Sequence, residues 1–493
     1  MYKNNFKSGF FMTLKKKTIS GVAWNGVGNI ARQILMVVTL IVMARFLTPE
    51  DFGVFAILMI FVTFMNIFAS MGTSQAVIHL DNPDQRMLSS IFYFNIVMGL
   101  ALFGLLYVLA WPIATVFEQP GMVHLLQLVG LSFIITTASL VQKALLEKAM
   151  LFKRVVMIET MALTLSSIAG MASAVYGLGI YSLIIMALSN AGILSVSLWL
   201  NSHWRPSLKF AIDDIKQIWS YSFNLTSFGF INYFARQSDH FLIGKFIGSG
   251  ALGVYSLAYK IMLYPLENVS RVIVRVLFPA FSEVKHDNVR FKSGYLKAIT
   301  FIALVTFPIM FGLVVTAENF VDVVFGDQWS QMIVLLIILA PIGLMQSIVT
   351  TVGSIYLAKG TTSLMFRIGA VSAVVTVLSF IIGIPFGVEG VAIAYAIANL
   401  IMLYPNLKIS WDQIELGVFE GLAKLAPFFL AATVMAITVY YLGEWIESFN
   451  PWQIVTLIIQ IIVGIIVYIG LLMTFYRQPV IEMVKGLKAE RRL

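Results

Sequence analysis

The sequence predicts an all-α integral membrane protein with about fourteen transmembrane helices. Hydrophobic residues make up 59% of the 493 residues and charged residues only 12%, whereas soluble domains carry about 25% charged residues. The mean hydropathy is +0.90, and the apolar residues form runs long enough to cross a bilayer. The composition therefore excludes a soluble globular protein. The net charge of +9 comes from short basic loops beside the spans and does not indicate a nucleic-acid partner.

Each span needs about 20 predominantly apolar residues, and glycine, proline and clusters of charge mark the breaks between spans. The longest polar stretches lie near 203–216, 283–297 and 408–419, so no connecting loop is long enough for a separate catalytic domain. We expect spans at 18–45, 52–78, 87–116, 121–146, 155–176, 179–202, 216–244, 251–281, 296–317, 330–357, 362–385, 388–407, 420–442 and 451–476.

The distribution of basic residues predicts the orientation of these spans. Of the 33 Lys and Arg residues, 26 fall in the segments expected on one side of the membrane, and only Arg45 and Lys245 fall in loops on the other side. Cytoplasmic loops carry the excess of positive charge in membrane proteins. Because the number of spans is even, both termini are expected in the cytoplasm.

Two segments 200 residues apart resemble each other, which indicates an internal repeat. Arg45-Phe-Leu-Thr-Pro-Glu-Asp-Phe-Gly-Val-Phe-Ala56 and Lys245-Phe-Ile-Gly-Ser-Gly-Ala-Leu-Gly-Val-Tyr-Ser256 share a basic-Phe-aliphatic start and a Gly-Val-aromatic-small end. Six spans separate the copies, so the halves run in the same direction, although short Phe/Gly-rich turns can also match by chance. The predicted parts are a basic tail at 1–17, an N-lobe at 18–210, a C-lobe at 211–410, two further spans at 411–480 and a basic tail at 481–493.

We single out nine ionisable side chains within the apolar, membrane-length segments. A charge at the bilayer centre costs about 2.5–3.5 kcal/mol on insertion scales, so such residues usually face water or one another. Five of them are fixed cations, which predicts a wet, positively charged interior and an anionic substrate. They are Arg32, Glu159, Arg236, Asp239, His240, Lys260, Glu267, Arg271 and Arg275.

Two spans carry these charges as stripes. In the eighth span, Lys260, Glu267, Arg271 and Arg275 fall within about 80° of one helical face, and Pro265 interrupts the helix between the first two. In the first span, the polar residues that share a face are Asn25, Asn29 and Arg32. We interpret both stripes as the lining of a cavity through which the substrate moves; networks of ion pairs and amide hydrogen bonds between helices are the alternative.

In the seventh span, Arg236 and Asp239 are three residues apart and are expected to pair, either as a structural latch or as a gate. We assign Arg236 to the cationic lining. The carboxylates Asp239, Glu267 and Glu159 are the candidates for ion coupling or gating, because a desolvated carboxylate can accept a proton. No phosphate-binding loop, no His-Glu-x-x-His motif and no cysteine is present, so the sequence predicts no cofactor, no metal site and no enzymatic activity.

Five motifs in order carry a resemblance to a known family. They are Thr18-Ile-Ser-Gly-Val-Ala-Trp24, Arg45-Phe-Leu-Thr-Pro-Glu-Asp-Phe-Gly53, Asp239-His-Phe-Leu-Ile-Gly-Lys245, Arg275-Val-Leu-Phe-Pro-Ala-Phe281, and Asn319-Phe320 with Val324-Phe-Gly-Asp-Gln-Trp329. With these motifs the chain resembles Wzx-type polysaccharide flippases, close to the colanic-acid exporter branch of the multidrug/oligosaccharidyl-lipid/polysaccharide exporter superfamily. The resemblance extends over nearly the whole chain.

The resemblance implies two six-helix lobes around a central cavity, with two peripheral helices at the C-terminus. It also implies alternating-access export of an undecaprenyl-pyrophosphate-linked oligosaccharide from the cytoplasmic to the outer leaflet of the bacterial inner membrane. The products would be exopolysaccharide, capsule or O-antigen, and a polysaccharide polymerase is an implied partner. By helix, the cations of related lipid II flippases correspond to Arg32, Lys260 and Arg271. A cation-coupled multidrug-type extruder and a membrane glycan polymerase are the alternatives.

Overall fold

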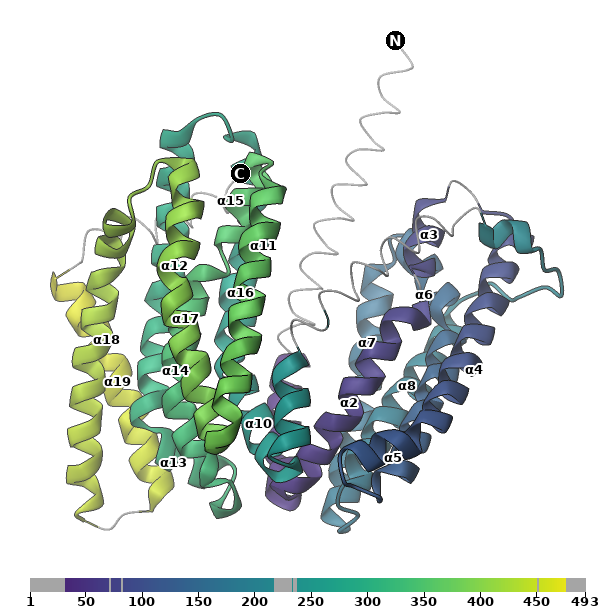
Figure 1. The fold of residues 1–493 in the computed structure, drawn as a ribbon, viewed down its shortest axis with the longest axis horizontal. Helices are drawn as coiled ribbons and strands as arrows, with labels where there is room; N and C mark the ends of the chain where they lie inside the picture. Colours follow the sequence, from purple (N-terminus) through teal and green to yellow (C-terminus); the bar gives the residue numbers. More distant parts are fainter. Residues whose placement is uncertain are drawn as a thin grey trace. The chain divides into compact units, whose positions relative to one another are not determined.

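The computed structural model describes residues 32–70, 72–80, 83–216, 233, 237–449 and 452–475, with the side chains at 70 and 275–280 left outside the description. Every regular element in these ranges is a helix, which confirms the predicted all-α class (Figure 1). Contacts divide the chain into two compact units, the first ending at Gly250 and the second beginning at Ala251. Each unit is described by itself.

The first unit opens with a helix over residues 32–46 and closes with a helix over 237–246. A short helix at 212–216 lies in the connection that comes after α8. The labelled helices between them are α2 (Pro49–Ser70), α3 (Thr73–His79), α4 (Gln85–Val116), α5 (Met122–Thr137), α6 (Leu140–Lys148), α7 (Phe152–Val175) and α8 (Tyr181–Asn201).

The second unit begins within α10, whose first two residues precede the division. Its helices are α10 (Ser249–Pro265), the π-helical turn η1 (Leu266–Ser270), α11 (Arg271–Glu283), α12 (Asn288–Val315), α13 (Ala317–Val324), η2 (Asp327–Trp329), α14 (Gln331–Val349), α15 (Val352–Lys359), α16 (Thr362–Gly383), η3 (Ile384–Phe386), α17 (Gly387–Trp411), η4 (Asp412–Ile414), α18 (Val418–Glu447) and α19 (Gln453–Phe475).

The two repeat segments adopt the same local structure. In each copy one helix ends at the Phe after the basic residue, at 46 and 246, and the next helix begins three residues later, at Pro49 and Ser249. The first copy starts its helix with a reciprocal cap, because the Thr48 hydroxyl accepts a hydrogen bond from Asp51 N and the Asp51 carboxylate accepts one from Thr48 N at 2.9 Å. The second copy turns instead at Gly248, whose φ of +120° suits glycine.

Nine helices in the described part of the chain are long and apolar enough to cross a membrane, and the pair α5 and α6, bent by 41°, makes a tenth if it is one span. One of the nine is the 53-residue segment Thr362–Ile414, which contains both α16 and α17. The helices at 32–46 and 237–246 are short within the described ranges, and the segment from α10 to α11 carries several charges. The multi-pass architecture is confirmed, and the count of fourteen stays a prediction.

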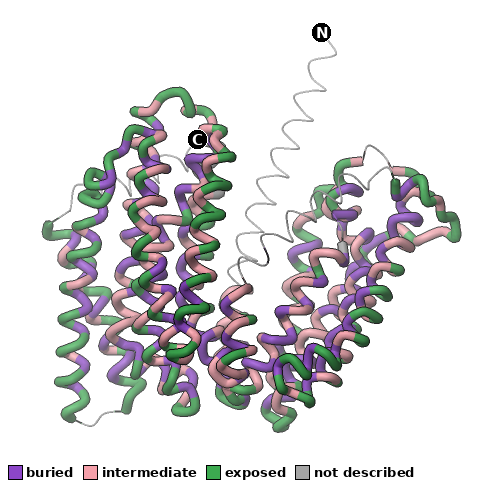
Figure 2. The backbone as a smooth tube through the Cα atoms, in the orientation of Figure 1, coloured by how far each residue is buried: buried purple, intermediate pink, exposed green. Residues whose placement is uncertain are grey.

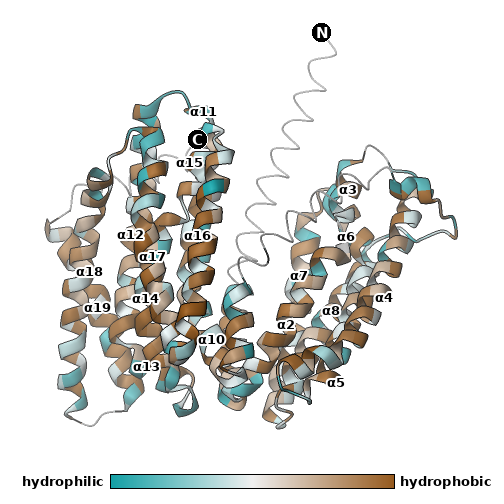
Figure 3. Ribbon diagram, in the orientation of Figure 1, coloured by the Kyte–Doolittle hydropathy of each residue, from teal (hydrophilic) through white to brown (hydrophobic). Residues whose placement is uncertain are grey.

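Buried and exposed residues recur along the helices (Figure 2), and many of the exposed ones are large and apolar. In α19 the buried side includes Gln460, Gly464 and Tyr468, whereas Ile458, Ile465 and other large aliphatic residues are exposed. Figure 3 shows hydrophobic residues along the helices and hydrophilic ones gathered in the loops. Exposed aliphatic residues between polar ends are the pattern of helices in contact with lipid.

Polar contacts inside the second unit join α12, α15 and α17. Tyr295 and Trp411 are fully buried, and the Trp411 indole N–H donates to the Tyr295 hydroxyl at 3.0 Å. The same hydroxyl lies 2.6 Å from the Thr351 hydroxyl. At the other end of this unit, Asn319 donates to Glu447 at 2.9 Å and to Gln460 at 3.3 Å, which ties α13 to α18 and α19. The two helices predicted to follow the C-lobe therefore belong to the packed core of this unit.

The segment around residue 210 is attached to the first unit. The buried carboxylate of Asp214 accepts hydrogen bonds from Ser90 at 2.8 Å and from Arg86 at 3.1 Å, both on α4. The helix at 237–246 also contacts this unit, because Lys245 pairs with Glu118 at 3.1 Å. These contacts explain why the first unit extends to residue 250, whereas the lobe boundary at 210/211 and the other predicted part boundaries stay predictions.

Candidate functional site

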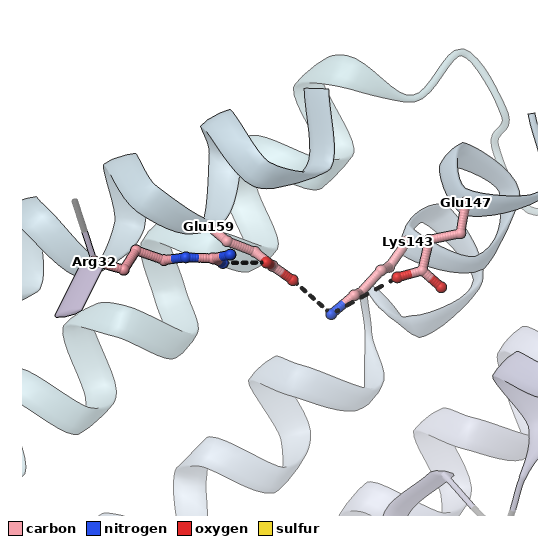
Figure 4. A network of polar contacts seen from close by, with 4 residues as sticks. All are labelled: Arg32, Lys143, Glu147 and Glu159. Atoms are coloured by element: carbon pink, nitrogen blue, oxygen red, sulfur yellow. Dashed lines mark hydrogen bonds and ion pairs between the residues drawn. The ribbon is translucent and has the colours of Figure 1, made fainter. Parts of the chain in front are cut away.

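The polar network that carries the predicted site joins three helices of the first unit (Figure 4). Arg32, in the helix 32–46, donates from Nη1 to Glu159 Oε2 at 2.7 Å. Glu159 is in α7, 127 residues further along the chain. The sequence analysis named both residues but assigned them to separate roles, one to the cavity lining and one to coupling. The structure shows that they form one ion pair.

Lys143 of α6 completes the network from the other side. Its Nζ lies 2.8 Å from Glu159 Oε1, the oxygen that Arg32 does not use, and 4.0 Å from Glu147 Oε1 on its own helix. Figure 4 shows the ammonium group between the two carboxylates. Among the described residues, the network thus contains two cations and two carboxylates, whose formal charges sum to zero.

The side chains of the network are partly exposed. Arg32, Glu159 and Lys143 have exposed fractions of 21%, 26% and 35%. Glu159 lies about 10 Å along α7 from its start, and about 24 Å from its end, at 1.5 Å per residue. Arg32 is about 21 Å from the end of its own helix at residue 46, so the two side chains meet at similar depth.

Lys143 was not among the predicted site residues, because it lies near the end of the predicted span 121–146 and was counted with the basic residues of the cytoplasmic side. It lies just after the bend between α5 and α6, and this bend carries the lysine toward α7. Its spacing of four residues from Glu147 was the available signal, because such pairs lie on one helical face. Spacing alone does not indicate a partner on another helix.

The predicted stripe of the eighth span does not run along an uninterrupted helix. Pro265 is the last residue of α10, and a π-helical turn comes next over Leu266–Ser270, which confirms the predicted interruption. A π turn closes its hydrogen bonds from residue i to i+5 and holds one extra residue, so it rotates the next helix, α11, by about one residue step. The single face expected for Lys260 and Arg271 was worked out at about 100° per residue, and the π turn between them changes that angle. The lining role of these two residues stays a prediction.

Within this segment, Arg271 pairs with Glu267 at 2.9 Å, and both side chains are more than 40% exposed. Lys260 is exposed on α10. Arg275 lies in α11, but its side chain is outside the description. Two of the three described cations from the predicted lining, Arg32 and Arg271, are therefore paired with carboxylates.

Three further predicted residues, Asn25, Asn29 and Arg236, lie outside the described residues. Asp239 is buried in the helix 237–246 and accepts a hydrogen bond from the backbone N of His240 at 2.8 Å. His240 Nδ1 lies 2.7 Å from Gln237 Oε1. The expected pair of Arg236 with Asp239 stays a prediction.

The family follows from comparison with known sequences. A family model described as "Polysaccharide biosynthesis protein" matches residues 42–334, more than half of the chain and including Lys143 and Glu159. The chain belongs to this family. The predicted Wzx-type resemblance is confirmed, since the relatives of this polysaccharide biosynthesis protein include a Wzx protein.

Three relatives match along most of their length. The chain is 27% identical over 471 residues to the teichuronic acid biosynthesis protein TuaB of Bacillus subtilis, covering 94% of this chain and 97% of that one. It is 25% identical to the lipopolysaccharide biosynthesis protein WzxC of Escherichia coli, covering 88% and 89%. It is 26% identical to the succinoglycan biosynthesis transport protein ExoT of Rhizobium meliloti, covering 94% of both.

The fold is that of a solved transporter. The structure of the lipid II flippase MurJ in an inward closed conformation superposes with a TM-score of 0.74 at 16% identity, covering 93% of this chain and all of that one. The chain therefore has a MurJ-like fold, and its long apolar helices agree with the multi-pass membrane protein that the sequence predicted.

Proposed function

We propose that the protein moves a polyprenyl-pyrophosphate-linked oligosaccharide from the cytoplasmic to the outer leaflet of a bacterial inner membrane, with both termini in the cytoplasm. Relatives are named for the biosynthesis of three different polysaccharides, and one of them is named as a transport protein. Such polymers are assembled from units that must cross the membrane. The protein acts as a transporter and not as an enzyme.

The observation that carries the proposal is the pair Arg32–Glu159 with Lys143, a charged network inside the transmembrane part of a flippase-like fold. The pyrophosphate is the costly part of the substrate to move, because its charges lose their hydration in hydrocarbon. Cations in a wet interior replace that hydration, the glycan stays in the same interior, and the polyprenyl chain stays in lipid. Rocking of two lobes would alternate access to the two leaflets.

Arg32, Lys260, Arg271, Arg275 and Arg236 are the proposed cationic lining. Asn25 and Asn29 would complete the stripe of the first span, and Asp239, Glu267 and Glu159 are the proposed gating or coupling carboxylates. A cation that is paired with a carboxylate can still bind the substrate, because an arriving phosphate can take the place of that carboxylate. We also propose that the exported units are built into exopolysaccharide, capsule or O-antigen, and that a polysaccharide polymerase is a partner of the protein.

Depletion of the protein tests this function. A cell that lacks it should accumulate the lipid-linked oligosaccharide in the cytoplasmic leaflet and stop making polymer. The variant Arg271→Ala should do the same at a normal membrane level of protein, because Arg271 contacts the substrate and its pair with Glu267 is exposed enough to contribute little to stability. Arg290→Ala, which breaks an equally short-range pair with Asp287 on an exposed turn, is the control and should leave polymer production intact. Outer-leaflet accumulation of the intermediate in depleted cells would refute the proposal.

A further inference from the structure

The two oxygens of Glu159 bind two cations that come from different helices. Arg32 occupies Oε2 at 2.7 Å and Lys143 occupies Oε1 at 2.8 Å. Glu159 therefore brings the two cations together at one point. Here a single small anion holds a guanidinium and an ammonium at hydrogen-bonding distance, which is the arrangement that these groups adopt around a phosphate.

We propose that Glu159 is the resident counter-anion of a pyrophosphate subsite formed by Arg32 and Lys143. In the empty protein the carboxylate holds both cations in place, and the substrate's pyrophosphate displaces it and binds the same two groups. This inference rests on the proposed function and names the residues that first receive the charged part of the substrate.

The exposure of the three side chains and the position of Glu159 along α7 both favour exchange of this carboxylate with the substrate over a permanent ion pair. The three side chains have exposed fractions of 21% to 35%, so an anion can approach without first breaking the packing of the helices. Glu159 lies about 10 Å from the start of α7, and the predicted orientation puts that start at the cytoplasmic face. The subsite is therefore on the side of the membrane where the substrate would be loaded.

The competing carboxylate also explains how a charged substrate can leave. A cluster of unpaired cations would hold pyrophosphate tightly and release it slowly. Glu159 remains tethered beside the two cations when it is displaced, so it can return to them as the substrate departs. The second carboxylate, Glu147, lies 4.0 Å from Lys143 and keeps the formal charge of the empty network at zero. Passage through a transport site requires binding that is favourable but reversible.

Binding of inorganic pyrophosphate to the purified full-length protein in neutral-lipid nanodiscs tests the inference. The variant Glu159→Gln should bind pyrophosphate about tenfold more tightly than the wild type. In the wild type the carboxylate occupies most of the sites, and apparent affinity is reduced in proportion to the fraction that is open; the variant has no carboxylate to displace. Lys143→Gln should bind at least about fivefold more weakly, which corresponds to loss of one of two charge-assisted contacts. Lys292 and Glu420 form a comparable pair at 2.7 Å between α12 and α18, so Lys292→Gln and Glu420→Gln are matched controls and should stay within about twofold of the wild type.

Unchanged or weaker pyrophosphate binding by folded Glu159→Gln would overturn the inference. If this variant does not fold, Lys143→Gln decides, and wild-type affinity in that variant overturns the inference as well. The same preparations are assayed for movement of a lipid-linked saccharide. A wild-type protein that moves it while Glu159→Gln shows no gain in affinity leaves the proposed function intact and removes only the counter-anion role. A wild-type protein that does not move it refutes the function itself.

Discussion

The Arg32–Glu159 pair should contribute measurably to stability, and a double-mutant cycle with Arg32→Gln and Glu159→Gln measures that contribution. Two unit charges about 4 Å apart interact by about 4 kcal/mol at an effective dielectric constant of about 20. The side chains of Arg32 and Glu159 have exposed fractions of 21% and 26%, so solvent screening and desolvation reduce this value. We therefore expect a coupling free energy of about 1–2 kcal/mol. Hydrogen bonds between transmembrane helices average about 0.6 kcal/mol in such cycles, so the ion pair should exceed them.

The two single variants should differ, because Glu159 has two cationic partners and Arg32 shares one carboxylate. Glu159→Gln leaves Arg32 and Lys143 without that carboxylate and should destabilise the protein by about 2–3 kcal/mol, whereas Arg32→Gln leaves the contact between Lys143 and Glu159 and should cost about 1–2 kcal/mol. Reversible unfolding in mixed micelles measures both. A coupling free energy below about 0.5 kcal/mol, or a larger effect of Arg32→Gln, would refute the assignment of Glu159 as the shared centre.

Two predictions concern packing in the second unit. A side chain at Gly421 would overlap the buried ring of Trp411, so Gly421→Leu should lower the free energy of unfolding by about 1–3 kcal/mol in the same assay. Gly470 has open space around it, so the control Gly470→Ala should change stability by less than about 1 kcal/mol in either direction. Equal effects of the two variants would contradict the contact. Tyr295→Phe removes the acceptor of the Trp411 N–H and should cost about 1–3 kcal/mol, and an unaltered unfolding midpoint would show that this buried hydrogen bond is not required.

Local patterns in the sequence were sufficient for much of the architecture. Apolar runs of membrane length predicted the all-α class, because a chain in hydrocarbon must satisfy its own backbone hydrogen bonds. The repeat at Arg45 and Lys245 predicted two equivalent helix–turn–helix junctions, which the structure has at the same offsets. Pro265 predicted the break in the eighth span, since proline removes a backbone donor, although the pattern did not indicate that a π-helical turn would form there.

Charge pairing followed a different rule. Glu267 and Arg271 are four residues apart, a spacing that favours a local ion pair on a helix, and the structure contains this pair at 2.9 Å. No spacing connects Arg32 with Glu159 across 127 residues, or either residue with Lys143. Their meeting depends on how α6 and α7 pack against each other and on where the bend after α5 directs the lysine.

By itself, the sequence determined that this chain crosses the membrane many times, that ionisable groups lie within the spans, and which family it belongs to. The first two properties depend on composition and on periodicity along single helices, and the family follows from similarity of sequence to known relatives. Only the tertiary structure decided which charges on different helices meet, and it joined two separately predicted residues and one overlooked lysine in a single network. The physical reason is that a charge in a poorly solvated interior takes the nearest opposite charge in space, and the distance along the chain does not enter the energy of that contact.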